Sequence, residues 1–159
     1  MKDFLWRTCK EFLAVNARLK SKRIREDTRC SICNEGDETI RHTFFECCQA
    51  KSIWTVSEFK DITNDIPFEP PTRMLKWVME KIGPEKMGKF TCIAWATWTW
   101  RNKKVLGGDE TNLQSLVLAF LKMLEDYQRY ASRVLEDSVV KSVPSFDKWY
   151  PPPPRLVED

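Results

Sequence analysis

The sequence predicts a mainly α-helical protein, and three observations support this fold class. Apolar residues recur at helical spacings in several segments, as they do on one face of a helix. Gly, Pro and Asn residues separate these segments and are typical of turns. The 159 residues also include seven Trp and nine Phe, whose large side chains bury the most area per residue. We therefore expect a folded helical core, and no segment carries a strong strand pattern.

The N-terminal part is expected to form two short helices before a turn-rich stretch. Their apolar residues are Phe4, Leu5, Phe12, Leu13 and Leu19. Asn16 precedes the second helix and is expected to cap it. Residues 28–36 are rich in turn-forming residues, and Thr39 is expected to cap a helix that starts near Ile40.

The middle of the chain predicts a loop and then the central helix. Residues 61–72 contain three prolines and are expected to form a loop, with Thr72 capping a short helix that runs to about Lys81. After Gly83-Pro84 comes the most apolar stretch, residues 90–100. It has little polar face, which predicts a Trp-rich, buried central helix. This helix is expected to end in the basic residues 101–104 and the Gly107-Gly108 break.

The last expected helix starts near Thr111 and carries a heptad pattern. Apolar residues step alternately by four and three along it, at Leu113, Val117, Phe120, Leu124, Tyr127, Ala131 and Val134. Such a stripe packs on the core of its own chain or forms a seam between two chains. The pattern therefore predicts internal packing, with self-association through the 113–134 helix as the alternative.

We expect three consecutive parts along the chain. Residues 1–60 form a metal-binding unit, and residues 61–140 form a helical region packed on it, so that the two make one compact unit. Residues 141–159 form a Pro-rich linker, in which Pro151 to Pro154 favour an extended polyproline II spacer.

Charge is unevenly distributed. The net charge is +3, but residues 1–29 hold nine Lys or Arg against four Asp or Glu, a formal +5, which leaves −2 for the rest. Basic clusters of this kind contact phosphates, although a charge run is also typical of a solvated helix face. The candidate nucleic-acid-binding residues are Arg18, Lys20, Lys22, Arg23, Arg25, Arg101, Lys103 and Lys104.

The chain shows no secretory or membrane signal. Charges interrupt the first 13 residues, and nowhere do 18 apolar residues follow one another. We therefore expect an intracellular protein, in the nucleus or cytoplasm, with no membrane association. Cysteines in such a reducing compartment bind metal or stay free more often than they pair.

Three cysteines and the only histidine have the spacing of a metal site. Cys30 and Cys33 form C-x2-C, His42 follows after eight residues, and Cys47 or Cys48 comes next. A turn and a helix start can together supply the four tetrahedral ligands of one zinc ion. Two alternatives are that Cys47 and Cys48 are small buried hydrophobes and His42 is a surface residue, or that cysteines form a disulfide.

The predicted zinc is structural. Four protein ligands leave no open coordination position, so the ion is not expected to act as a Lewis acid. Arg29 and Arg41 adjoin ligands and are expected to offset the negative charge of the thiolates. Cys47 and Cys48 point about 100° apart on a helix, so only one can face the ion.

Several motifs resemble a known family. FLWR, CSIC, ETIRHTFFEC and QAKSIW resemble the reverse-transcriptase zinc-binding domain of plant LINE-type non-LTR retrotransposons. AWATWTWRNKKV resembles the segment that follows this domain, and Trp149-Tyr150 with the prolines resembles the lead-in to a ribonuclease H domain. The resemblance implies Cys30, Cys33, His42 and Cys47 as ligands, and Cys48 stands where the family usually has proline.

No enzymatic activity is expected. The chain contains no Tyr-x-Asp-Asp polymerase motif and no carboxylate set after Trp149, and a two-metal nuclease needs several converging carboxylates. We therefore expect a non-catalytic, retrotransposon-derived zinc-binding domain that assists sequence-independent binding of RNA or DNA. Two alternatives are a zinc-stapled protein-interaction or dimerisation module and an unselected retroelement remnant.

Overall fold

The expected mainly α fold is confirmed. The structure is a computed structural model that describes residues 1–107 and 111–140, with side chains described as far as Val134. These residues form helices and one isolated antiparallel bridge between Arg29 and Asp37. The expectations for Gly108, for the 141–159 linker with its prolines and for Trp149-Tyr150 lie outside the described residues.

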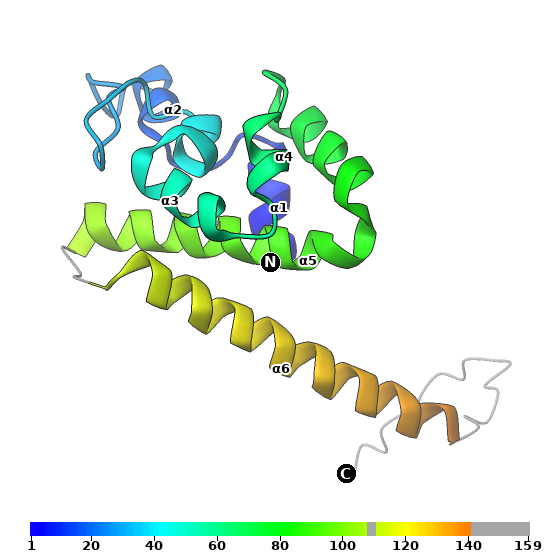
Figure 1. Cartoon of the computed structure of the whole chain (residues 1–159). Coiled ribbons are helices and arrows are strands. Elements are labelled where there is room, and N and C mark those ends of the chain that lie inside the picture. The colour runs from blue at the N-terminus through cyan, green and yellow to red at the C-terminus, as the bar shows by residue number, and fades with distance from the viewer. Residues whose placement is uncertain (108–110, 141–159) are drawn as a thin grey trace, which may run out of the picture. The chain divides into compact units, whose positions relative to one another are not determined.

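Helices follow one another along the described chain (Figure 1). They are α1 (Lys2–Cys9), α2 (Asn16–Ser21), the π-helical η1 (His42–Glu46), α3 (Cys48–Val56), α4 (Lys60–Asn64), α5 (Pro71–Gly107) and α6 (Leu113–Val140). Met1–Asp126 form one unit, and a second unit begins at Tyr127 within α6. None of the helices in the described ranges is long and apolar enough to cross a membrane.

The long helix α5 is two helices joined at Gly83. This residue has φ 77° and ψ 164°, a conformation that is essentially restricted to glycine. Pro84 then opens the second half, where a helix tolerates a residue without an N–H. Figure 1 shows the chain changing direction at this break. The expected separation at Gly83-Pro84 is therefore present.

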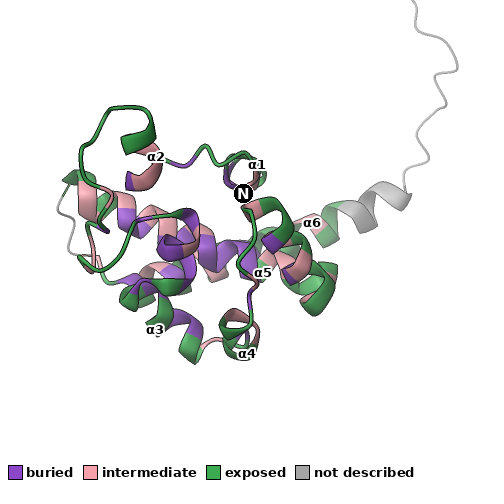
Figure 2. Cartoon of the chain, turned by 90° about the horizontal axis from the view of Figure 1, so that it is seen from above, coloured by how far each residue is buried: buried purple, intermediate pink, exposed green. Residues whose placement is uncertain are grey.

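The second half of α5 is the centre of the core. Phe90, Cys92, Ile93, Ala96 and Trp100 on it are buried, and α1 and η1 pack against α5. Buried residues gather on the second half of α5, whereas the loop after α2 is mostly exposed (Figure 2). The expected buried central helix at residues 90–100 is therefore confirmed.

Aromatic rings hold α3, η1 and α5 together. The Trp54 and Phe90 rings lie 4.8 Å apart, the Phe59 and Phe90 rings 5.4 Å apart, and the Phe45 and Trp54 rings 5.6 Å apart. Such pairs add to the free energy gained from burial alone. The Trp54 indole N–H also donates to the carbonyl of Phe44 at 2.5 Å, so the polar edge of this buried ring has a partner.

Two expected helix boundaries are wrong, whereas α6 begins at Leu113, close to its expected start near Thr111. Residues 61–72 are only partly a loop, because α4 occupies Lys60–Asn64. Thr72 does not cap α5, which begins at Pro71; its hydroxyl instead donates to the carbonyl of Cys9 at 3.0 Å. The cap of α6 is Asn112, whose Oδ1 accepts from the N–H groups of Gln114 and Ser115 at 2.8 and 3.3 Å.

Asn16 is also not the cap of α2. It is the first residue of this helix, and its buried side-chain amide donates to the carbonyl of Arg29 at 2.6 Å. Glu38 satisfies the helix N-terminus instead. Its Oε2 accepts from the Asn16 N–H at 2.9 Å, and its carbonyl accepts from the Ala17 N–H at 3.2 Å. Glu38, which is distant in the sequence, therefore accepts the hydrogen bonds from the helix N-terminus that a local cap residue usually accepts.

The heptad stripe on α6 changes character along its length. Leu113, Val117 and Leu124 are buried, and the Phe120 ring contacts the Trp95 ring edge-to-face at 4.8 Å. Further along, Tyr127 is 67% exposed and Val134 is 44% exposed. Internal packing therefore accounts for the half of the stripe that lies in the first unit, from Leu113 to Leu124.

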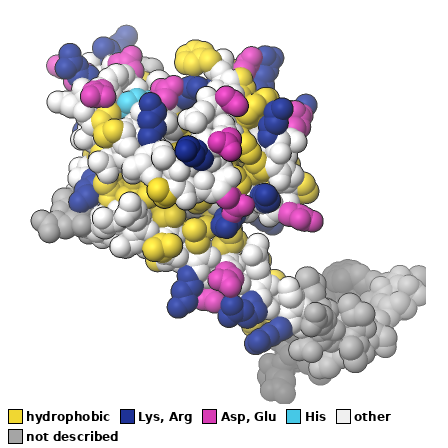
Figure 3. Space-filling view, viewed as in Figure 1, with side chains coloured by type: hydrophobic (Ala, Val, Ile, Leu, Met, Phe, Trp, Pro, Cys, Tyr) yellow, Lys and Arg dark blue, Asp and Glu magenta, His cyan; other side chains and the backbone are white. Residues whose placement is uncertain are grey.

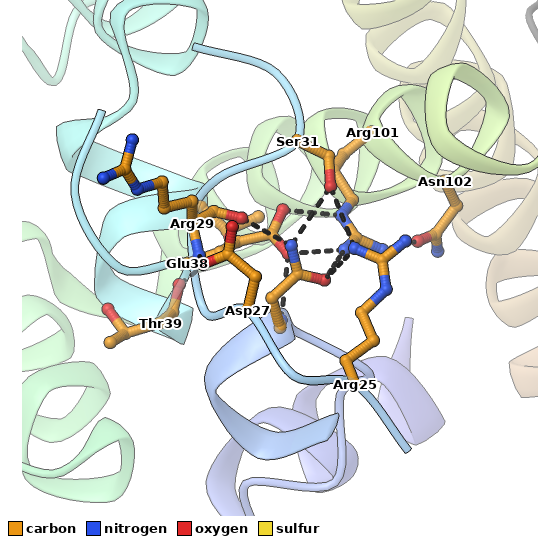
Figure 4. A network of polar contacts seen from close by, with 10 residues as sticks. Arg25, Asp27, Arg29, Ser31, Glu38, Thr39, Arg101 and Asn102 are labelled. Atoms are coloured by element: carbon orange, nitrogen blue, oxygen red, sulfur yellow. Dashed lines mark hydrogen bonds and ion pairs between the residues drawn. The ribbon is translucent and has the colours of Figure 1, made fainter. Parts of the chain in front are cut away.

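A buried ion pair connects segments that are far apart in the sequence (Figure 4). Glu38 and Arg101 are both almost fully buried. The Arg101 Nε donates to Oε1 of Glu38 at 2.8 Å and its Nη2 donates to Oε2 at 2.5 Å, the two-pronged geometry of a strong charge-assisted pair. Asn16 Oδ1 accepts from Nη1 of Arg25 at 2.9 Å, which extends the network toward the surface.

Removing one partner of this pair is expected to destabilise the protein strongly. Arg101→Met leaves the Glu38 carboxylate buried without its cation, which costs about 3–5 kcal/mol. The double variant Glu38→Leu/Arg101→Met should regain part of this loss, because no unpaired charge remains although the Asn16 N–H loses its acceptor. Urea unfolding measures both. Arg73→Met is the control, since Arg73 pairs with Glu69 at an exposed site, where a pair contributes at most about 1 kcal/mol. Equal stability losses for Arg101→Met and Arg73→Met would contradict the prediction.

Candidate metal centre

The structure brings four predicted ligands together. One ligand atom each from Cys30, Cys33, His42 and Cys47 lies within 4.8 Å of all the others. The Cys33 Sγ and His42 Nε2 are 3.3 Å apart. Around a tetrahedral zinc with bonds of about 2.0–2.3 Å, ligand atoms lie about 3.5–3.8 Å apart. The cluster therefore needs only small side-chain adjustments to hold one ion.

A tight turn positions Cys30 and Cys33. The N–H of Asn34 donates to the carbonyl of Cys30 at 2.9 Å, and the N–H of Cys30 donates to the carbonyl of Gly36 at 3.1 Å. Asn34 and Gly36 have φ values of 61° and 59°, which Asn and Gly adopt most easily. A Cβ at Gly36 would lie 3.7 Å from His42 Nδ1, so the backbone of the turn lies close to the imidazole ring.

A single π-helical turn positions His42 and Cys47. Residues five apart on an α-helix point about 140° apart, which would separate these two ligands. In η1 the N–H of Cys47 donates to the carbonyl of His42 at 2.8 Å, the i to i+5 bond of a wider turn. Thr39 begins this segment as expected, with its Oγ1 accepting from the His42 N–H at 3.0 Å. Because of the π turn, His42 and Cys47 face the same site although they are five residues apart.

Cys47 and Cys48 lie in different surroundings. Cys47 is buried in the cluster and immediately precedes α3, whereas Cys48 is exposed. Burial raises the pKa of the Cys47 thiol to about 12, although the backbone N–H groups of Gln49 and Ala50 partly oppose this by donating to its sulfur. These N–H groups belong to the first turn of α3, where the helix dipole favours negative charge.

The donor set suits zinc. Burial also raises the pKa of the Cys30 thiol, so without a cation these sulfurs keep their protons. A bound cation reverses this preference, because it stabilises the thiolate directly. Soft thiolates with one imidazole are ligands that select zinc, while oxygen ligands suit magnesium and calcium.

The arginines beside the ligands do not neutralise the sulfurs as expected. Arg41 donates to Oε1 of Glu46 at 2.6 Å and to the carbonyl of Pro67, in the loop before α5, at 2.7 Å. Arg29 is exposed, and its carbonyl accepts from Asn16. Both residues therefore fix the surrounding chain.

The predicted basic residues of the N-terminal part differ in how far they are exposed and in what they contact. Lys20, Lys22 and Arg23 are exposed at the end of α2 and just after it. Arg18 donates to the carbonyl of Glu11, with its guanidinium 4.6 Å from the centre of the Phe12 ring. Arg25, exposed, bonds to Asn16.

In the second group of predicted phosphate-binding residues, Arg101, Lys103 and Lys104, one residue is buried. Arg101 is removed from the predicted phosphate contacts, because its guanidinium is buried and bonded to Glu38. Lys103 is exposed. Lys104 is half-buried, with its Nζ 5.9 Å from the Trp100 ring centre.

The sequence did not reveal Glu38 and Asn16 as key buried polar residues. Glu38 lies in a polar, turn-rich stretch, where an acidic residue is normally exposed. Asn16 has the residue type of a helix cap, and this local pattern hid its long-range contacts. Neither residue carries a local signal of burial.

Comparison with known proteins supports the metal site independently. Residues 1–54 match the family described as zinc-binding in reverse transcriptase. This segment is therefore similar to a zinc-binding domain of the reverse-transcriptase type and carries four residues that could hold one zinc ion. The match spans about a third of the chain, includes all four clustered ligands and ends within α3. No curated protein and no solved structure matches the chain.

Purified protein is expected to contain about one zinc per chain, because four ligands complete one tetrahedral shell. Cys33→Ser and Cys47→Ala should each release the metal and lower stability strongly, since zinc binding contributes folding free energy. Cys48→Ala is the matched control and should keep the metal. Elemental analysis together with thermal unfolding measures both effects. Retention of zinc by Cys47→Ala and its loss in Cys48→Ala would refute the ligand assignment.

Proposed function

We propose that this chain is a non-catalytic domain derived from the reverse transcriptase of a plant LINE-type non-LTR retrotransposon, and that it assists binding of RNA or DNA. The observation that supports this most is the coincidence of the four-ligand cluster with the reverse-transcriptase zinc-binding match over residues 1–54. The AWATWTWRNKKV segment in α5 supports the non-LTR origin by resemblance.

The proposal of a structural zinc follows from the ligand count. Three cysteines and one histidine fill a tetrahedral shell, which leaves no position for a water or substrate. Cys30, His42 and Cys47 are also buried. Zinc would then hold the turn at residues 29–37 against η1 and stabilise the surface that α2 presents.

This surface combines positive charge with exposed aromatic rings. The Trp6 and Phe12 side chains are 52% and 50% exposed, and their rings lie edge-to-face at 5.5 Å. Arg18 covers Phe12 and belongs to α2, which leads into Lys20 and Lys22. Where Figure 1 places α2, Figure 3 shows Lys and Arg side chains reaching the surface among Asp and Glu side chains. Basic groups beside aromatic rings bind single strands by charge and stacking, with little sequence preference.

Single-stranded RNA is expected to bind at low salt, with an affinity that falls as salt rises, because phosphate binding releases counterions. Lys20→Glu/Lys22→Glu/Arg23→Glu should weaken binding and flatten the salt dependence while zinc content stays unchanged. Fluorescence anisotropy with labelled RNA and DNA at two salt concentrations measures this. The matched control is Lys60→Glu/Lys76→Glu/Lys122→Glu, which makes the same charge change at exposed residues elsewhere. Absence of binding by the wild type at low salt would rule out the nucleic-acid role.

Self-association is a second candidate function, favoured by the exposed end of the heptad stripe. Tyr127 and Val134 continue the apolar pattern of α6 but are 67% and 44% exposed. A second copy of the same helix would offer these positions an apolar partner with matching repeats. Leu124 is unsuitable for testing this idea, because it is buried and its replacement by a charged residue would disturb the core.

Tyr127→Glu/Val134→Glu is therefore expected to convert a dimer into a monomer while zinc content and helicity persist, since a charge in an apolar seam opposes pairing. Sedimentation velocity over a range of concentrations measures the oligomeric state. Ser132→Glu, an exposed polar position on the same helix, is the control. A wild type that sediments as a monomer at every concentration would exclude self-association.

A further inference from the structure

A groove lies between the N-terminal segment and the outer side of α5. It has a volume of ≈ 470 Å³ and is lined on one side by α1 and residues 12–14, and on the other by α5 residues that include Trp95, Trp98 and Asn102. This volume lies in the range of about 300–1,000 Å³ that small-molecule sites occupy. The groove is separate from the zinc cluster, whose ligands do not line it.

Two half-buried tryptophans form the α5 wall. Trp95 and Trp98 are three residues apart, so they are neighbours on one helix face. The Trp95 ring packs on Phe120 at 4.8 Å, and the Trp98 ring lies 5.3 Å from the Arg101 guanidinium. Arg101 also lines the groove, and Glu38 holds its guanidinium by two hydrogen bonds. Both rings also line an adjoining hollow of ≈ 580 Å³ that extends the groove toward Lys103.

Positive charge lies at the opposite wall. Arg7 and Arg25 line the groove, together with the single acid Asp3. Arg7 pairs with Asp3 at 3.0 Å in an exposed i,i+4 contact, which is weak. The Arg25 guanidinium is held by Nη1 at 2.9 Å from Asn16 Oδ1, and a guanidinium has five N–H donors in all. The groove therefore combines flat apolar rings with groups that bind phosphate.

We infer that this groove binds an unpaired nucleobase of single-stranded nucleic acid, with the base stacked on Trp98 and its phosphate contacted by Arg25. The inference rests on the proposed nucleic-acid function and adds a defined site to it. Stacking on an aromatic ring accepts any base, because every base has a π face. A paired base in a duplex cannot enter, since its faces are covered by neighbouring bases. A wholly apolar peptide would leave the Arg25 guanidinium without an anionic partner.

The test uses a short single-stranded RNA with one 2-aminopurine, whose fluorescence falls when the base stacks. Wild-type protein should quench it and should bind the single strand more tightly than the matching duplex. Trp98→Leu should abolish quenching and weaken single-strand binding by about tenfold, as expected for the loss of one stacked base. Arg25→Gln should weaken binding while quenching at saturation persists. Trp77→Leu is the matched control, a partly buried tryptophan in the first half of α5 that does not line the groove.

A second measurement keeps the inference testable if Trp98→Leu does not fold. Adenosine monophosphate added to isotopically labelled wild-type protein should shift the indole N–H signals of Trp98 and Trp95 and leave the buried Trp54 unchanged. Salt-dependent binding that is equal for single strand and duplex, without quenching, would overturn the groove assignment but keep the proposed function. No binding of any nucleic acid at low salt would overturn both.

Discussion

The buried pair between Glu38 and Arg101 connects the zinc-binding segment to the central helix, and much of the remaining structure depends on this connection. Glu38 supplies both oxygens to Arg101 and also satisfies the first N–H groups of α2. One side chain therefore positions α2, the turn that carries the cysteines and the end of α5. A buried ion pair adds little net stability compared with apolar residues of the same size. We infer that its main effect here is to specify one arrangement of these segments.

Zinc and the ion pair restrain the same short segment from its two sides. Residues 29–37 offer few apolar side chains of their own, so this turn cannot be held by hydrophobic burial alone. A zinc ion held by the cluster would fix its cysteines to His42 and Cys47, while Glu38 fixes its end to α5. The π turn of η1 is part of this arrangement, because it brings the two later ligands onto one side. The aromatic cluster around Phe90 then packs α3 and α5 together within the apolar core.

The same supports shape the surface that we assign to nucleic acid. The Arg101 guanidinium lies 5.3 Å from the Trp98 ring centre, and Asn16 Oδ1 accepts from the guanidinium of Arg25. Arg101 and Asn16 belong to the Glu38 network, so the groove is organised by the residues that join the zinc segment to α5. Lys20 near the end of α2 and Lys22 and Arg23 just after it are more exposed and add charge at the surface. A sequence-independent interaction suits this division, since phosphate attraction tolerates mobility and stacking benefits from a rigid ring.

The sequence by itself determined the helical fold class, the central helix at residues 90–100, the break at Gly83-Pro84 and the spacing of the zinc ligands. These features depend on local periodicity, on backbone geometry specific to Gly and Pro, and on short-range ligand spacing, all of which are visible within a few residues. Only the tertiary structure decided the capping of α2, the burial of Arg101 and the grouping of Trp98 with Arg25. Glu38 and Arg101 are 63 residues apart, and a charged residue is normally exposed unless a partner compensates its burial. That partner is defined only once the chain has folded, so no local pattern could show that these two charges would meet in the core.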